Sequence, residues 1–355
     1  MKTIDRHIGS SFLRSFGLVV IILVVLFSFL ELLAQLDDAG KGNYQVGDVF
    51  IFMGLTLPRR MLDLMPISAL LGSVVALGLL ADHGELLAMQ AGGISVQRIC
   101  WSMFATGTVL IFLTALLAEM VVPPLDQLAR KKRAYAISGS DFSLTKQGFW
   151  ARRGSTYIHV GKTHSGGVTY DMDIFEADET GRLKMYSYAR EANIQNKDQW
   201  VLREITRKTF TEEGIKTTHI PSLILDSFLS SEQVGFLEIP TDSLSSSDLY
   251  RYAEAMRENG QNVDRYALSL WRKLSVPLST GAMVLLSLTF VFGFTRRITA
   301  GKRIMLGSFV GVIFYSADQV IVHLGLLLSL SPLVTAMTPV VLIASIALWK
   351  LRRVV

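Results

Sequence analysis

Two long apolar segments flank the sequence LLADHGELLAMQAGGIS, Leu79 to Ser95. Leu86, Met89 and Gln90 follow the i, i+3, i+4 spacing of a helix, and Gly92-Gly93 is expected to end it. A helix of about two turns between membrane segments has no core of its own in which to bury an apolar face. The pattern therefore predicts a helix that docks into a groove of another protein, or else an ordinary loop helix at the membrane surface.

The segments that flank this stretch belong to a set of apolar runs along the whole chain. Apolar residues make up 50% of the 355 residues, and the mean hydropathy is +0.39. They are concentrated in runs of about 20 residues, the length that crosses a bilayer as a helix. We predict an α-helical polytopic membrane protein with six transmembrane helices, at about residues 15–36, 61–80, 99–122, 274–294, 304–330 and 333–349.

Two proline positions set the expected limits of these spans. The run from Val49 to Leu57 is apolar but too short to cross, and Pro58 is expected to end it, so it is predicted to be a helix lodged in the outer leaflet. Pro123-Pro124 is expected to end the third span. The first span is longer than a signal-peptide core and lacks a small-residue cleavage site, so we predict that it is uncleaved.

A polar segment with short β-type runs separates the third and fourth spans. Turn-forming residues divide these runs, and strands at such spacing indicate a small antiparallel sandwich or roll. Ser245 to Ser247 is expected to cap a polar amphipathic helix that Gly260 closes. The predicted strands lie at residues 149–152, 156–160, 168–175, 183–189 and 200–206, and the helix at 248–259.

The distribution of positive charge predicts the orientation. Lys and Arg gather at one side of the predicted spans, whereas the short loops on the other side offer only Lys41, Arg59 and Arg60. Because cationic residues mark cytoplasmic ends, both termini are predicted to be cytoplasmic and the strand-rich domain to lie outside. The cations on the cytoplasmic side are Lys2, Arg6, Arg14, Arg98, Arg296, Arg297, Lys302, Arg303, Lys350, Arg352 and Arg353.

A basic cluster on the outer side departs from that distribution. Arg130, Lys131, Lys132 and Arg133 follow the third span at the depth of the outer headgroups. Guanidinium groups pair with phosphate through two hydrogen bonds, so the cluster predicts contact with an anionic lipid or a phosphorylated ligand, which Lys41 could join. The alternative is a solvated helix start whose charges pair with Asp126 and its neighbours.

Ionisable residues inside the predicted spans are costly and usually face a partner or a cavity. Asp318 lies deepest, on the fifth span with His323, whereas Glu31, Asp63 and Glu119 lie near the outer ends, where water is close. A proton relay would use several such groups at matched depth, which the sequence does not show.

The sequence contains no recognisable catalytic, phosphate-binding or metal-binding motif. Gly161-Lys162-Thr163 lacks the glycine that a phosphate-binding loop needs five residues earlier, and His159 and His164 have no carboxylate or cysteine to complete a metal site. The single Cys100 excludes an intrachain disulfide and is expected to be buried. We therefore predict no catalytic residues, no metal, no cofactor and no nucleic-acid partner.

Taken in order, four motifs resemble the LptF/LptG permeases of the lipopolysaccharide exporter, LptG more closely, along the whole chain. They are Ile4 to Gly9, Glu85 to Gly93, Gln127 to Arg130 and Phe314 to Gln319. The resemblance implies three spans with a cytoplasmic coupling helix at 82–95 in residues 1–133, a periplasmic β-jellyroll at 134–245, and a linker helix with three spans at 246–355. It also implies a location in the bacterial inner membrane.

The resemblance further implies partners and roles. The partners would be an LptF-like permease in a heterodimer, two copies of an LptB-like ATPase, an LptC-like protein with the periplasmic bridge, and lipopolysaccharide. Glu85, Leu86, Met89 and Gln90 would contact the ATPase, with Glu85 making the polar contact and Leu86 and Met89 the apolar ones. Asp318 and His323 would lie on the lateral-gate helix.

The same resemblance assigns lipopolysaccharide phosphates to Arg130 and Arg133, with Lys131 and Lys132 beside them. The first span departs from the family pattern, because Asp37-Asp38 stands where a lysine pair is expected, and Lys41 is the available substitute. The function implied is a non-catalytic permease subunit. A membrane-anchored scaffold that does not transport, and a proton-coupled carrier that depends on Asp318, are the alternatives.

Overall fold

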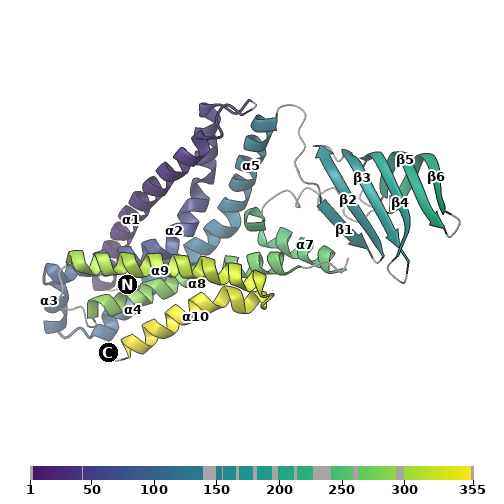
Figure 1. Cartoon of the computed structure of the whole chain (residues 1–355). Helices are drawn as coiled ribbons and strands as arrows, with labels where there is room; N and C mark the ends of the chain where they lie inside the picture. Colours follow the sequence, from purple (N-terminus) through teal and green to yellow (C-terminus); the bar gives the residue numbers. More distant parts are fainter. Residues whose placement is uncertain are drawn as a thin grey trace. The chain divides into compact units, whose positions relative to one another are not determined.

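The computed structural model describes residues 3–41, 43–138, 149–153, 155–164, 168–178, 182–193, 199–211, 214–226, 241–258, 263–292 and 300–352 (Figure 1). The chain divides into two compact units, which we describe separately. The first consists of Met1–Asp37, Met53–Asp126 and Ala267–Val355, and the second of Asp38–Phe52 and Gln127–Tyr266. Several residues named above lie outside the described ranges: Lys2, Gly260, Arg296, Arg297 and Arg353.

Six helical stretches in the described part are long and apolar enough to cross a membrane, which confirms the predicted six spans. They are α1 (Thr3–Leu36), α2 (Val46–Asp82), a composite of α4 (Val96–Leu116), η1 (Leu117–Val121) and α5 (Val122–Ser138), then α8 (Asp264–Phe292), α9 (Ala300–Leu327) and α10 (Pro332–Leu351). The spans of α2 and α8 are the most buried, whereas those of α1, α9 and α10 expose most of their side chains. The first unit is therefore organised around α2 and α8.

The second span is longer than predicted, because Pro58 does not end a helix. Residues Val46–Asp82 form one α-helix that contains Pro58 and Pro66. The expectation of a separate short helix in the outer leaflet was therefore wrong. A membrane makes each unpaired backbone group costly, so a helix there continues through a proline that would stop it in water. At about 1.5 Å per residue, α2 is longer than a bilayer core is thick.

The third span also continues through its prolines. Leu117–Val121 is a π-helical turn, in which the Val122 amide bonds the carbonyl of Leu117, and α5 follows without a break. Pro123 and Pro124 have no N–H, and the wider turn before them accommodates the missing bonds. The prediction that Pro123-Pro124 ends the third span was wrong, and the helix carries its register into the basic cluster.

The helices of the first unit pack through small residues and a continuous apolar cluster. The largest cluster joins α1, α2, α3, α4 and α8, with Phe12, Leu77, Met103 and Leu288 fully buried. A Cβ added to Gly72 would lie 2.6 Å from Phe16 Cα, so only glycine allows α2 this close to α1. Through these contacts α1, α2 and α4 pack together around one apolar core.

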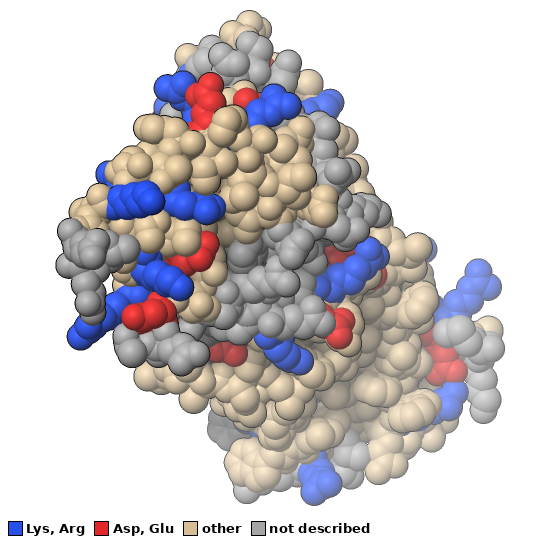
Figure 2. All heavy atoms as spheres, turned by 90° about the vertical axis from the view of Figure 1, so that its right-hand side faces the viewer, with Lys and Arg blue, Asp and Glu red and all other residues tan. Residues whose placement is uncertain are grey.

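The second unit contains one antiparallel sheet of six strands, each beside its neighbour in sequence. This confirms the predicted inserted β domain. Alternate side chains such as Ile158, Met172 and Leu202 form its buried face, as the period of two requires. Figure 2 shows the molecule from the right-hand side of Figure 1. Acidic and basic side chains are interspersed in that view, which shows no large surface of a single sign. The strands are β1 (Phe149–Arg153), β2 (Thr156–His164), β3 (Val168–Ala177), β4 (Leu183–Asn193), β5 (Gln199–Thr211) and β6 (Gly214–Asp226).

The sixth strand was not among the predicted ones, and it contains Pro221. Pro221 lies on the edge strand β6, opposite Glu204 on β5. The residues on either side of these two are paired across the strands, but Pro221 and Glu204 are not. Glu204 has a left-handed φ of 51°, and Asp171 on β3 has a φ of 58°. A proline that cannot donate to the ladder is tolerated at such an edge irregularity.

A short helical connection leads from the sheet back to the spans. It consists of η2 (Thr241–Ser243) and α7 (Ser246–Glu258). The Asp248 amide donates to Ser245 Oγ over 3.1 Å, which confirms the predicted serine cap.

Candidate functional site

The basic cluster lies on the last turns of α5, in the second unit. Lys131 and Lys132 are exposed, and no described residue forms an ion pair with either. Arg130 and Arg133 are only partly exposed, because they are one turn apart on the face of α5 that packs inside the unit. The structure therefore divides the four cations into two solvent-facing lysines and two arginines with neighbours.

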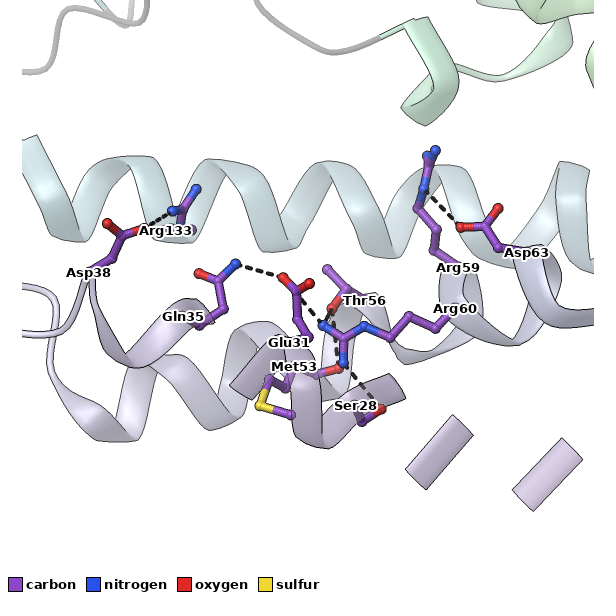
Figure 3. Close-up of polar contacts among 10 residues, drawn as sticks. All are labelled: Ser28, Glu31, Gln35, Asp38, Met53, Thr56, Arg59, Arg60, Asp63 and Arg133. Carbon is purple, nitrogen blue, oxygen red and sulfur yellow. Dashed lines mark hydrogen bonds and ion pairs between the residues drawn. The ribbon is translucent and has the colours of Figure 1, made fainter. Parts of the chain in front are cut away.

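Arg133 is held by an acid and an aromatic ring. Its Nη2 donates to Asp38 Oδ2 (Figure 3), and its guanidinium carbon lies 5.5 Å from the centre of the Phe52 ring. Lys41 Nζ lies 2.5 Å from the other carboxylate oxygen of Asp38. One carboxylate is therefore shared by two of the cations that the sequence assigned to phosphate.

The loop after α1 brings Asp38 to α5. The Asn43 amide donates to the Ala136 carbonyl over 2.7 Å, and Tyr44 is buried beside it. This loop packs on α5 within the second unit. It therefore brings Asp38 next to Arg133, although the two residues are 95 positions apart in the sequence. Asp38, which the sequence marked only as a departure from the family pattern, is a member of the site.

Arg130 already has a hydrogen-bond partner within the second unit. Its Nε donates to Ser243 Oγ over 3.1 Å, and the Gln127 side chain donates to the Ser243 carbonyl over 3.0 Å. Both contacts fix η2, the turn that leads from the sheet to α7. Arg130 thus anchors the connection, and part of its guanidinium is already engaged within the chain.

Electrostatics keep Asp38 charged. Hydrogen bonds from Lys41, and then from Arg133, lower the pKa of the Asp38 carboxyl below its ordinary value. Burial raises the pKa of the Tyr44 hydroxyl, so this tyrosine stays neutral and cannot serve as a second anion for Arg133. Asp38 is accordingly the internal counter-ion of the basic cluster.

In the first unit, Glu31, which lies near the Leu36 end of α1, is also paired. Glu31 Oε1 accepts from Gln35 over 2.7 Å and lies 3.7 Å from Arg60 Nη2, while Arg60 also donates to Ser28 and Thr56 (Figure 3). Arg59 lies 3.9 Å from Asp63 and 3.5 Å from the buried Asp126. Asp126, which the sequence proposed as a partner of the basic cluster, therefore pairs with α2.

The short helix α3 (Glu85–Ala91) forms where the sequence predicts it. It is bounded by Gly84, which has a left-handed φ of 73°, and by Gly92. Glu85 Oε2 lies 2.8 Å from His7 Nε2 on α1. Both termini lie at this end of the helices (Figure 1). The polar residue expected to contact the ATPase is thus already joined to the first helix.

The apolar side of α3 packs against the chain's own core. Leu86 is 5% exposed and belongs to the core cluster with Ile99 and Met103, and Met89 packs against the same cluster. Leu87, which the sequence analysis did not single out, is 63% exposed. The i, i+3 stripe of a two-turn helix between spans faces its own chain, so Leu86 is not available to a partner in this arrangement. Gln90 is partly exposed.

The intramembrane acids form ion pairs with α8. Asp318 Oδ2 on α9 lies 2.9 Å from Arg272 Nη2, and Glu119 in the π-helical turn lies 3.2 Å from Lys273 Nζ. His323 Nδ1 donates to the Gln319 carbonyl over 2.8 Å. Arg272 and Lys273, which are adjacent on α8, therefore connect α8 to the fifth span and to the third span, respectively. The sequence analysis did not identify Arg272 as a partner of Asp318.

Comparisons with known proteins agree with this architecture. The family model for lipopolysaccharide export system permease LptF/LptG matches residues 6–353. The lipopolysaccharide export system permease protein LptG of Haemophilus influenzae is 33% identical over 354 residues, which are 99% of each chain. The LptG protein of Escherichia coli strain K12 is 30% identical over 352 residues, which are 99% of this chain and 98% of that protein. With six spans and an inserted β domain, this multi-pass membrane protein belongs to the LptF/LptG family of lipopolysaccharide export permeases.

Proposed function

We propose that the last turns of α5 bind the phosphate groups of lipopolysaccharide during export. The observation that carries this proposal is the arrangement of Arg133. Its guanidinium is held against Phe52 and already binds one oxyanion, the carboxylate of Asp38. A group that holds a carboxylate in this geometry can hold a phosphate in the same way.

The lysines and arginines would act in order. Lys131 and Lys132 are exposed and would attract the phosphate first, since charge at the surface raises the local concentration of an anionic ligand. Arg133 would then exchange Asp38 for phosphate, or share its remaining N–H groups between the two. Lys41, paired with the same carboxylate, would join the site by exchanging Asp38 for phosphate in its turn. Arg130 would support the site through Ser243.

Asp38 gives the site a means of release. A carboxylate that stays charged competes with phosphate for Arg133 and limits how tightly the lipid is held. Moderate affinity suits a permease, because a lipid bound too tightly at an intermediate site would not move on.

Energy would come from a separate ATPase that docks on α3. The surface available to such a partner includes Leu87, Gln90 and the exposed part of Glu85, and Leu86 and Met89 would serve inside the chain. Because Leu86 packs with residues of α4, a displacement of α3 would be transmitted to the spans through the core. The second permease, the LptC-like protein and the periplasmic bridge would be further partners.

The orientation that fits this function places both termini and α3 in the cytoplasm. The β-sheet and the outer end of α5 would then lie in the periplasm, with domain limits near 133 and 245. Support comes from the cations at the end of the first unit that holds the termini, among them Arg98 and Arg352. Asp318 and His323 would lie on a helix that borders the lipid path.

Photo-crosslinking tests the phosphate site. A photoreactive residue at Leu128, which is exposed and one turn before Lys132, would report lipopolysaccharide bound at the cluster. Arg133→Glu should weaken crosslinking strongly and Asp38→Asn should strengthen it, while Arg251→Glu, an exposed charge reversal on α7, should leave it unchanged. Equal crosslinking in the Arg133 variant and the unsubstituted chain would refute the site.

A further inference from the structure

An apolar cavity of about 620 Å³ lies in the first unit between α4, α8 and α10. Its walls are formed by side chains that include Trp101, Phe104, Leu285, Leu288 and Leu348. Its size falls in the range of cavities that bind small molecules, which is about 300 to 1,000 Å³. The elements that carry the phosphate site, α5 and the loop after α1, contribute nothing to it.

The polar groups of this cavity are gathered at one end. Gln97 stands in the first turn of α4, and Arg352 follows the last residue of α10. Arg352 is exposed, and no residue in the described part of the chain forms an ion pair with it. The cavity is therefore apolar along its length and cationic at its mouth.

The position of the cavity among candidate membrane spans suits a lipid. All three helices around it are candidate membrane spans, so its open side faces acyl chains. Trp101 lines it and is 64% exposed, near the end of α4 where a span meets the headgroups. Tryptophan is enriched at that depth. Basic pockets between spans at this depth bind anionic headgroups.

We propose that this cavity binds an anionic glycerophospholipid of the surrounding bilayer. An acyl chain fills the apolar part, and the headgroup phosphate pairs with Arg352 and accepts a hydrogen bond from the Gln97 amide. The lipid belongs to the leaflet whose headgroups lie at the end that holds α3 and Arg352. It fills the space between α4, α8 and α10 and is a resident of the permease, distinct from the lipid that is exported.

Lipid retention by the full chain is the first test. The protein is reconstituted in nanodiscs of phosphatidylcholine with phosphatidylglycerol, released into mild detergent, and its bound lipids are counted by native mass spectrometry. One phosphatidylglycerol should be retained. Arg352→Gln should weaken retention about five-fold, the effect of one cation near an anionic headgroup. Lys350→Gln, which removes a charge that does not line the cavity, is the matched control and should weaken retention less than Arg352→Gln does.

Filling the cavity gives an independent test. Leu348→Trp should displace the lipid, whereas Leu342→Trp on the same helix should not, because the two leucines are 49% and 50% exposed and only Leu348 lines the cavity. Retention of the lipid by the Leu348 variant would overturn the proposal. Equal retention of phosphatidylcholine would overturn the anionic specificity, and retention of lipopolysaccharide instead would show that the cavity belongs to the export path.

Cys100 provides a readout within the intact membrane. It is the single cysteine of the chain and lines the cavity. Its alkylation by N-ethylmaleimide, measured from the intact mass, should slow as the phosphatidylglycerol content of the nanodisc rises, and this protection should be lost in Arg352→Gln. Alkylation that is independent of lipid composition would contradict occupancy of the cavity by this lipid.

Discussion

Truncation of adjacent leucines on α3 separates folding from partner binding. Leu86 is 5% exposed and lies in the core cluster, so Leu86→Ala removes buried methyl groups and leaves a cavity. Such a change costs about 2 to 5 kcal/mol of folding free energy. Leu87 is 63% exposed, so Leu87→Ala should change stability by less than about 0.5 kcal/mol.

The effect on docking should be the reverse. Burying a whole leucine contributes about 1.5 to 3 kcal/mol, and the 63% of Leu87 that is exposed leaves about 1 to 2 kcal/mol to be gained in a partner's groove. Leu87→Ala should therefore weaken ATPase binding about 5- to 30-fold. Leu86→Ala should weaken ATPase binding only to the extent that it unfolds α3 and its packing on α4.

Both quantities can be measured on the same samples. Thermal unfolding in detergent gives stability, and titration of the purified permease with an LptB-like ATPase gives affinity. If Leu87→Ala binds as tightly as the unsubstituted chain while Leu86→Ala loses affinity without losing stability, then Leu86 faces the partner and the arrangement of α3 described above is wrong.

Three further predictions concern packing, charge and pH. Gly281→Ala should destabilise the chain by about 1 to 3 kcal/mol, because the new Cβ would lie 2.4 Å from Ile111 Cδ1; Ile111→Ala in the same chain should restore the thermal midpoint. Asp318→Asn should reduce export by leaving Arg272 without its carboxylate, and Arg272→Gln added to it should restore export, whereas a proton relay through Asp318 predicts no rescue. Burial and a hydrogen bond to Asp173 raise the pKa of Tyr186 to about 12. The folded state thus holds this proton more tightly, and its stabilising effect, complete below about pH 10, is lost as the pH rises toward 12; Tyr186→Phe should remove that loss in unfolding curves.

Much of the fold follows from hydropathy and turn chemistry. The six spans are predictable because apolar runs of membrane length are rare in chains that fold in water. Errors arose at Pro58 and Pro123, since a proline rule drawn from soluble proteins ignores the cost of unpaired backbone in a membrane. The sixth strand, Gly214–Asp226, was missed, and the structure places Pro221 on it at the edge of the sheet, where a proline is tolerated.

The site was less predictable, because it depends on contacts between distant residues. The basic cluster on α5 is visible in the sequence. The ion pair of Arg133 with Asp38 and the hydrogen bond from Arg130 to Ser243 are not. Helical spacing showed that α3 has an apolar stripe. It could not show that Leu86 faces the chain's own core and that Leu87 faces outward.

In the function proposed above, ATP drives lipopolysaccharide past the basic cluster on α5. Its most direct test is the yield of lipopolysaccharide crosslinked through position 128 in the complete membrane complex, before and after ATP is added. We predict a high yield without ATP, a fall on hydrolysis, and a low yield in both conditions for Arg133→Glu. A yield that neither ATP nor the Arg133 substitution changes would contradict the claim.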